Sequence, residues 1–119
     1  MDNPLIEALA NIPTYTPAGH SGTTNRRLVT ADDCLHFEMV TGSIEPGGVA
    51  DPHLHETEYQ AMLITGGRAR VTLGDQTPED VDAGSIVRIP PGVMHQVESL
   101  GPGNLELVIV YSPPISRPA

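Results

Sequence analysis

Residues 47–60 read GGVADPHLHETEYQ and place two of the five histidines of the chain directly after a glycine-rich turn. In an extended strand, alternate side chains point to the same face, so His53 and His55 are expected to aim at one point. Neutral imidazoles that converge in this way are typical ligands of a transition metal. The stretch therefore predicts part of a metal site, and the remaining ligands must come from elsewhere in the chain.

The length and composition indicate a single domain. The chain has 119 residues, enough to bury roughly two-thirds of the surface that its unfolded form exposes. Its one cysteine, Cys34, cannot form a disulfide within the chain. There is no basic-then-apolar leader and no apolar run of ~18 residues, so the chain is expected to be soluble and cytoplasmic, with no membrane partner.

The charge balance excludes two classes of function. Fifteen acidic residues stand against six arginines, and there is no lysine, which gives a formal charge of −9. A nucleic-acid partner would need a basic face, and six scattered arginines do not provide one. Without lysine, Schiff-base chemistry through a lysine is excluded.

One short helix is expected near the N-terminus, over residues 3–10. Asn3 can cap it, Pro4 suits the first helical position, and an apolar stripe follows. A helix this short is marginal alone and needs a surface on which to dock.

The next segment, residues 14–27, is expected to be an arm or loop in which His20 is solvated. Arg26 and Arg27 point in opposite directions if this segment is extended. One of them can then face a cavity and bind a carboxylate, while the other forms a surface ion pair, although surface pairs for both are the simpler interpretation.

The rest of the chain is expected to form short strands, because twelve glycines and twelve prolines interrupt it every few residues. No helix is expected between the strands, which implies an antiparallel sandwich or barrel. The organisation predicted is a helix and arm over 1–34, a barrel over 35–112 and a tail over 113–119. Besides the histidine stretch, strands are expected at 35–44, 61–65, 68–75, 85–89, 93–99 and 105–111.

The strand expected at 35–44 has two possible orientations. The simpler one buries Leu35, Phe37 and Met39 and exposes His36 and Glu38. The other turns the polar face toward a cavity, where His36 and Glu38 would be acid or base candidates.

Two expected strands, 61–65 and 105–111, are apolar on both faces except at Glu106. A barrel exterior in water should alternate more cleanly, so these strands are consistent with a homodimer that covers their outer face.

Two spaced motifs in the chain resemble those of the cupin superfamily. The first is Gly, five residues, His-x-His, three or four residues, Glu, six residues and Gly. The second is Gly, five residues, Pro-x-Gly, two residues, His, three residues and Asn. The matching positions here are Gly47, His53, His55, Gln60 and Gly67 for the first motif, and Gly84, Pro90, Gly92, His95 and Ser99 for the second. The compact spacing between Gly67 and Gly84 is similar to that of small single-domain bacterial cupins.

This resemblance implies an all-β fold, a double-stranded jelly-roll β-barrel whose mouth admits a ligand. It also implies that His53, His55, the glutamate position and His95 hold one divalent transition metal per chain, which sequence leaves open among Fe, Mn, Ni, Cu and Zn. Here Gln60 occupies the glutamate position. A register one residue shorter would place Tyr59 there, beside Glu58, but the register of Gln60 is favoured because it lands on Gly67.

A metal-dependent enzyme acting on a small organic molecule, with a carboxylate as one candidate group, is the function predicted on this basis. The reaction is either dioxygenation or a metal-assisted isomerase or lyase step, and a neutral Gln60 would leave the metal a stronger Lewis acid. The alternative is a non-catalytic barrel that binds a metal or a small molecule. Small cupins are commonly dimers. The predicted substrate contacts are Met62, Ile64 and Val97 as walls and Arg70 or Arg88 for an anion, and the candidate proton carriers are Tyr59, Glu58 and Tyr111.

Overall fold

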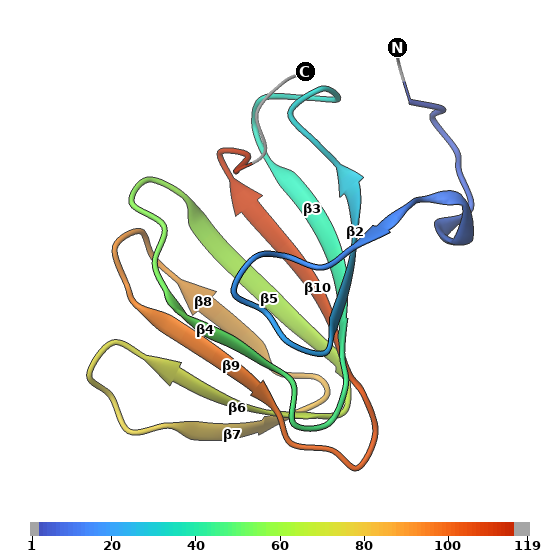
Figure 1. Cartoon of the computed structure of the whole chain (residues 1–119). Helices are drawn as coiled ribbons and strands as arrows, with labels where there is room; N and C mark the ends of the chain where they lie inside the picture. Colours follow the sequence, from blue (N-terminus) through green and yellow to red (C-terminus); the bar gives the residue numbers. More distant parts are fainter. Residues whose placement is uncertain (1–2, 116–119) are drawn as a thin grey trace.

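The computed structural model describes residues 3–115 and forms two antiparallel β-sheets packed face to face (Figure 1). One sheet has six strands in the order β1-β2-β3-β10-β5-β8, and the other has four in the order β4-β9-β6-β7. This confirms an all-β chain with turns between strands. The strands are β1 (Thr14–Tyr15), β2 (Thr23–Val29), β3 (Glu38–Ile44), β4 (Val49–His53), β5 (Tyr59–Gly66), β6 (Arg68–Leu73), β7 (Glu79–Asp82), β8 (Ile86–Ile89), β9 (His95–Ser99) and β10 (Leu105–Ser112).

The barrel is open along its sides, in contrast to the closed barrel that was predicted. Within residues 3–115, each ladder of paired strands joins members of one sheet, and the contact between the sheets at the N-terminal arm is a single bridge between His20 and Ala50. Backbone hydrogen bonds on either side of this bridge, from Ser21 N to Val49 O and from Asp51 N to Gly19 O, fix the arm to β4. The arm therefore forms part of the wall between the two sheets.

The hydrophobic core lies between the sheets and is built from alternate residues of each strand. The larger sheet contributes residues such as Met62, Ile64 and Leu105, which are at most 2% exposed, and the smaller sheet contributes Ala69 and Val71. Because side chains alternate across a strand, residues two positions away from these core residues also face the space between the sheets.

The N-terminal helix that was predicted over residues 3–10 is wrong. The described residues there form only a 3₁₀ turn, Leu9–Asn11, which has no side-chain cap. Leu5 and Ile6, which were expected to supply the apolar stripe, are 103% and 94% exposed. A segment this short does not hold a helix by propensity alone, and none of residues 3–115 covers Leu5 and Ile6.

The simpler orientation for residues 35–44 is also wrong. The strand β3 begins only at Glu38, so Leu35 and Phe37 precede it and are exposed. Val40 and Ile44 set the phase by packing into the core, and Glu38 shares their face and is 3% exposed. The alternative orientation agrees with the structure at Glu38, which lines a cavity, but not at His36, which precedes the strand and is exposed.

No helix in residues 3–115 is long and apolar enough to cross a membrane. Of the tail predicted at 113–119, residues 116–119 lie outside the described part of the chain. Pro114 is buried and Ile115 lines the main cavity, so the tail as far as Ile115 packs on the domain.

Candidate metal centre

Three histidines from two neighbouring strands converge between the sheets. His53 ends β4, His95 begins β9, and the two are direct partners in the antiparallel ladder. Their ring centroids are 4.2 Å apart, and the ring of His55, two residues after His53, lies 5.1 Å and 5.3 Å from them. One ligand atom from each of the three side chains lies within 4.8 Å of the others. Strand pairing therefore joins the two sequence motifs at a single point.

Backbone carbonyls orient two of these rings. His53 Nδ1 lies 2.8 Å from Asp51 O, and His95 Nδ1 lies 3.0 Å from Val93 O. A carbonyl oxygen can only accept, so each Nδ1 donates, which leaves Nε2 as the unprotonated nitrogen. Donation from the far ring nitrogen to a carbonyl is the usual outer-shell support of a metal-bound histidine.

Gln60 lies on the interior face, whereas Tyr59 does not. Gln60 is 4% exposed and lines the same cavity as the histidines, while Tyr59 is 40% exposed on the outer face of β5. Glu58 accepts a 2.8 Å hydrogen bond from Thr57 Oγ1, and like Tyr59 it does not line the cavity. Since adjacent residues of a strand face opposite sides, only one of the two registers considered can supply a fourth ligand from the interior.

Unpaired buried atoms test whether this cluster suits a metal. Within residues 3–115, His55 Nε2, His95 Nε2 and Gln60 Oε1 are buried and have no hydrogen-bond partner. Such orphaned atoms are costly in a folded protein and call for an occupant. Three imidazoles and one amide oxygen suit Fe, Mn, Ni, Cu or Zn in the divalent state, so the donor set fits the cofactor that the resemblance implies.

The environment of the histidines keeps them neutral. Burial lowers the pKa of His95 to about 4. Burial, reinforced by the proximity of His53, also lowers the pKa of His55 and of His20. A neutral imidazole is the form that binds a metal, so the site favours the ligating state.

Without metal, the protein is expected to lose stability as the pH falls from about 7 to about 5. In that range His95 becomes protonated in the unfolded chain but stays neutral in the folded protein, because burial lowers its pKa. Proton uptake therefore stabilises the unfolded state relative to the folded state. The stabilisation is complete above the ordinary histidine pKa of 6.5 and is lost on the way down to about 4. Urea unfolding of chelator-treated protein across this range measures it. A free energy of unfolding that stays level, or rises as the pH falls, would contradict the prediction.

A cavity of about 740 Å³ opens beside the three histidines. Met62 and Val97 line it, as predicted for apolar walls, while Ile64 does not line it and is completely buried in the core beneath. The cavity is large enough for a small organic molecule.

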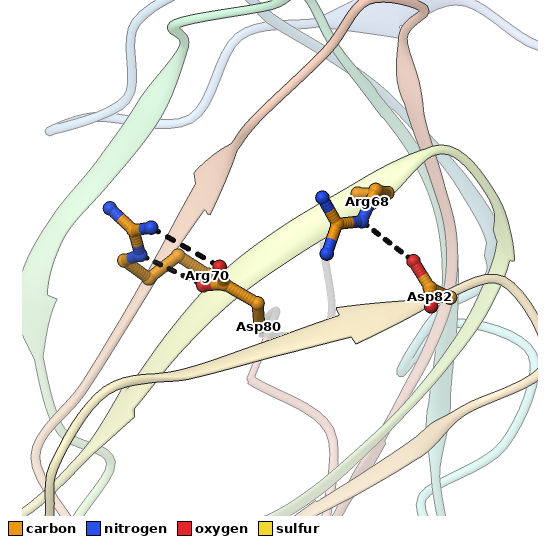
Figure 2. Close-up of polar contacts among 4 residues, drawn as sticks. All are labelled: Arg68, Arg70, Asp80 and Asp82. Carbon is orange, nitrogen blue, oxygen red and sulfur yellow. Dashed lines mark hydrogen bonds and ion pairs between the residues drawn. The ribbon is translucent and has the colours of Figure 1, made fainter.

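Arg70 and Arg88 lie outside the cavity, which corrects their prediction as anion contacts. Arg70 donates from Nε and Nη2 to Asp80 at 2.8 Å and 3.2 Å, and Arg68 pairs with Asp82 at 2.7 Å (Figure 2). Both pairs join β6 to β7 at the surface. Arg88 is exposed on β8, whose inward residues are Val87 and Ile89. Apolar residues occupy the inward-facing positions of these strands, so the arginines on the alternate positions face solvent.

Polar residues from the N-terminal part of the chain line the cavity instead. Arg27 and Tyr15 come from β2 and β1, and Glu38 from β3. His20 is half-buried rather than solvated, with its ring centroid 6.1 Å from that of His53. Of these, Tyr15 was not considered from the sequence and His20 was expected to be solvated, because nothing local indicates that the arm folds back onto β4.

Comparison with known proteins identifies the family. The model of the cupin domain matches residues 40–111, more than half of the chain. The chain belongs to the cupin superfamily. An uncharacterised protein of Streptomyces coelicolor is 32% identical to this cupin over 69 residues, which span 58% of this chain and 64% of that protein. The match therefore covers less than two-thirds of that relative.

Solved structures share the fold of this cupin at low identity. The polyketide cyclase RemF from Streptomyces resistomycificus superimposes with a TM-score of 0.81 and 23% identity, covering 100% of this chain and 83% of its own. A predicted oxalate decarboxylase from Thermotoga maritima gives 0.81 and 19%, covering 92% and 99%. Two differently named proteins match equally well, so the fold does not select a reaction.

Proposed function

We propose that this protein is a metal-dependent cupin enzyme that acts on a small organic molecule in the cavity. The observation that carries the proposal is the set of unpaired buried atoms, His55 Nε2, His95 Nε2 and Gln60 Oε1, whose residues all line the cavity. In this proposal His53, His55, Gln60 and His95 hold one divalent transition metal. The metal, when bound, supplies Lewis-acid polarisation of a substrate oxygen or a redox centre.

The neutral donor set favours metal-assisted isomerase or lyase chemistry over dioxygenation. None of the four proposed ligands carries a negative charge, so the positive charge of a divalent ion stays uncompensated by its own ligands and polarises a carbonyl strongly. Names among the structural neighbours include a cyclase and a predicted decarboxylase, and neither name specifies an oxygenase.

The proton-carrying role fits Tyr111 better than Tyr59 or Glu58. The ring of Tyr111 lies 5.6 Å from that of His55 and lines the cavity, which Tyr59 and Glu58 do not. Burial raises the pKa of Tyr111, so its phenol stays protonated and can donate a hydrogen bond to a substrate oxygen.

The test compares turnover of candidate substrates by Zn²⁺-, Mn²⁺- and Fe²⁺-loaded protein, with and without oxygen, beside His53→Ala. Turnover that persists under strict anaerobiosis and is lost in His53→Ala supports the isomerase or lyase form. Turnover that consumes oxygen and stops without it assigns a dioxygenase. Stoichiometric metal with no turnover of any substrate would overturn the enzyme assignment in favour of the non-catalytic, metal-binding alternative.

We also propose that the protein is a homodimer through the outer face of the larger sheet. Leu63 and Ile86 are cross-strand neighbours there and are 43% and 45% exposed, and Val108 extends the same row. Such a row of exposed apolar residues is typical of a covered surface. Light scattering should give twice the chain mass, Leu63→Asp should give the chain mass, and Met94→Asp at an exposed loop should leave the mass doubled. A wild-type mass of one chain would contradict the dimer.

A further inference from the structure

The inner face of the larger sheet carries a row of polar side chains that leads away from the histidines. In the register of β10, Tyr111 is the direct partner of Glu38 on one side and of Gln60 on the other. All three line the cavity. Adjacent strands are about 4.8 Å apart, so Glu38 stands roughly 10 Å from Gln60 across two strand spacings. The cavity therefore has two polar ends, one at the histidines and one at Glu38.

An ion pair occupies the second end. Arg27 Nε lies 3.9 Å from Glu38 Oε2, and the guanidinium carbon lies 3.8 Å above the centre of the Tyr15 ring. The Glu38 side chain is 4% exposed, whereas that of Arg27 is 46% exposed. The carboxylate of the pair is therefore buried and faces the cavity, while the guanidinium is partly open to solvent.

The charges of the two ends differ. At the second end, Arg27 and Glu38 together are neutral, and they place a donor group beside an acceptor group. At the histidine end, a divalent metal held by neutral ligands would keep its positive charge. An anionic group of a ligand would thus bind more favourably at the metal than at the second end. A ligand carboxylate placed beside Glu38 would be repelled by the like charge. A hydroxyl group, which both donates and accepts, matches the pair.

Apolar residues lie beside the polar row. Met62 and Ile109 are partners on β5 and β10, one step along the sheet from the polar row, and Leu107 follows. All three line the cavity and are buried. The middle of a bound molecule would therefore lie against an apolar floor.

We propose that the Arg27–Glu38 pair is a second binding subsite, and that the ligand class is a hydroxy acid with its carboxylate at the metal and its hydroxyl group at Glu38. The Glu38 carboxylate accepts a hydrogen bond from the hydroxyl group, and the Arg27 guanidinium donates one to the hydroxyl oxygen. The inference rests on the proposed metal site and names the substrate class of that site. Arg27 and Glu38 act here as positioning residues.

Three probes of equal chain length test the inference in calorimetric titrations of Zn²⁺-loaded protein: hexanoate, 6-hydroxyhexanoate and adipate. Wild-type protein is expected to bind 6-hydroxyhexanoate about tenfold more tightly than hexanoate, as a hydrogen bond to a charged group provides. Adipate should bind no more tightly than hexanoate. Equal affinity for all three, or a preference for hexanoate or adipate, would overturn the proposal. This ranking requires no variant.

Two variants locate the effect. Glu38→Gln should lose the preference for 6-hydroxyhexanoate over hexanoate. It should also bind adipate more tightly than hexanoate, because the positive charge of Arg27 is then no longer compensated. Arg26→Ala is the matched control, since Arg26 Nε donates 3.1 Å to Ile12 O and its side chain does not line the cavity. A hydroxyl preference that survives in Glu38→Gln would overturn the role of the pair.

A Zn²⁺ titration of each protein separates this inference from the proposed function. Zn²⁺ affinity should be the same within about twofold in wild type, Glu38→Gln and Arg26→Ala. If wild-type protein binds no metal, the proposed function fails. If metal binds and the hydroxyl preference is absent, the subsite alone fails.

Discussion

Replacement of His95 by alanine is expected to lower the affinity for Zn²⁺ more than about 100-fold, since loss of an outer-shell partner alone costs about 10–100-fold. His95 is 2% exposed and is the histidine that the second motif adds to the pair from the first. Without it, the smaller sheet offers only His53 and His55, and Gln60 remains on β5 of the larger sheet. The loss should come with little change in the fold, because the β4–β9 ladder is made by the backbone.

Competition with a chromophoric chelator measures this affinity, and thermal unfolding with and without Zn²⁺ gives an independent check. Metal at about 1,000 times its dissociation constant stabilises the native state by about 4 kcal/mol. That gain should appear in wild-type protein and fall to about 1.4 kcal/mol or less in His95→Ala, for which the same metal concentration is at most about ten times the dissociation constant. His36→Ala is the matched control, since His36 is exposed and does not line the cavity. Equal affinities for His95→Ala and wild type would exclude His95 as a ligand.

Replacement of Gly67 by alanine is expected to destabilise the fold by about 2–5 kcal/mol, the sum of a left-handed backbone cost and overpacking. Gly67 has φ +79°, and a Cβ built there would lie 2.5 Å from Asn104 O and 3.0 Å from Leu105 Cα. Both contacts are with main chain, which cannot rotate away. The turn from β5 to β6 therefore packs against the segment that leads into β10.

Gly84→Ala isolates the two contributions. Gly84 has φ +93°, but a Cβ there meets no atom within 4 Å. It should lose only about 1–2 kcal/mol, the cost of the left-handed conformation. Urea unfolding of both metal-free variants gives the comparison. Losses of equal size would show that the approach of Asn104 to Gly67 carries no energetic weight.

Where a local pattern of residues, such as a motif or an alternation, matches the strand arrangement of the fold, the sequence predicted correctly which side chains converge. His53 and His55 were predicted together from their spacing of two, and His95 was added because the two motifs resemble those of the cupin superfamily. The structure brings the three rings together. Gln60 was preferred to Tyr59 for its register, and the alternation of β5 turns Gln60 inward.

Errors arose where tertiary context decided the outcome. The segment at 3–10 has a capping residue and an apolar stripe, but Leu5 and Ile6 are uncovered in the part of the chain that the structure describes. Residues 35–44 alternate well from Leu35, yet the strand starts at Glu38 and follows the phase of Val40. The role of Arg27 depends on β2 pairing with β3, which an arm of low periodicity does not indicate.

The way in which the N-terminal arm is attached bears on how this cupin can change. Residues 19–21 are fixed to β4 by main-chain hydrogen bonds, while the side chains of Thr16, Pro17 and His20 line the cavity. Main-chain bonds do not depend on the side chain, so substitutions at Pro17 and His20 alter the shape of the cavity at small cost to folding, whereas the φ of +74° at Gly19 favours glycine. A new specificity can thus arise in one short segment while the three histidines and Gln60 stay as they are.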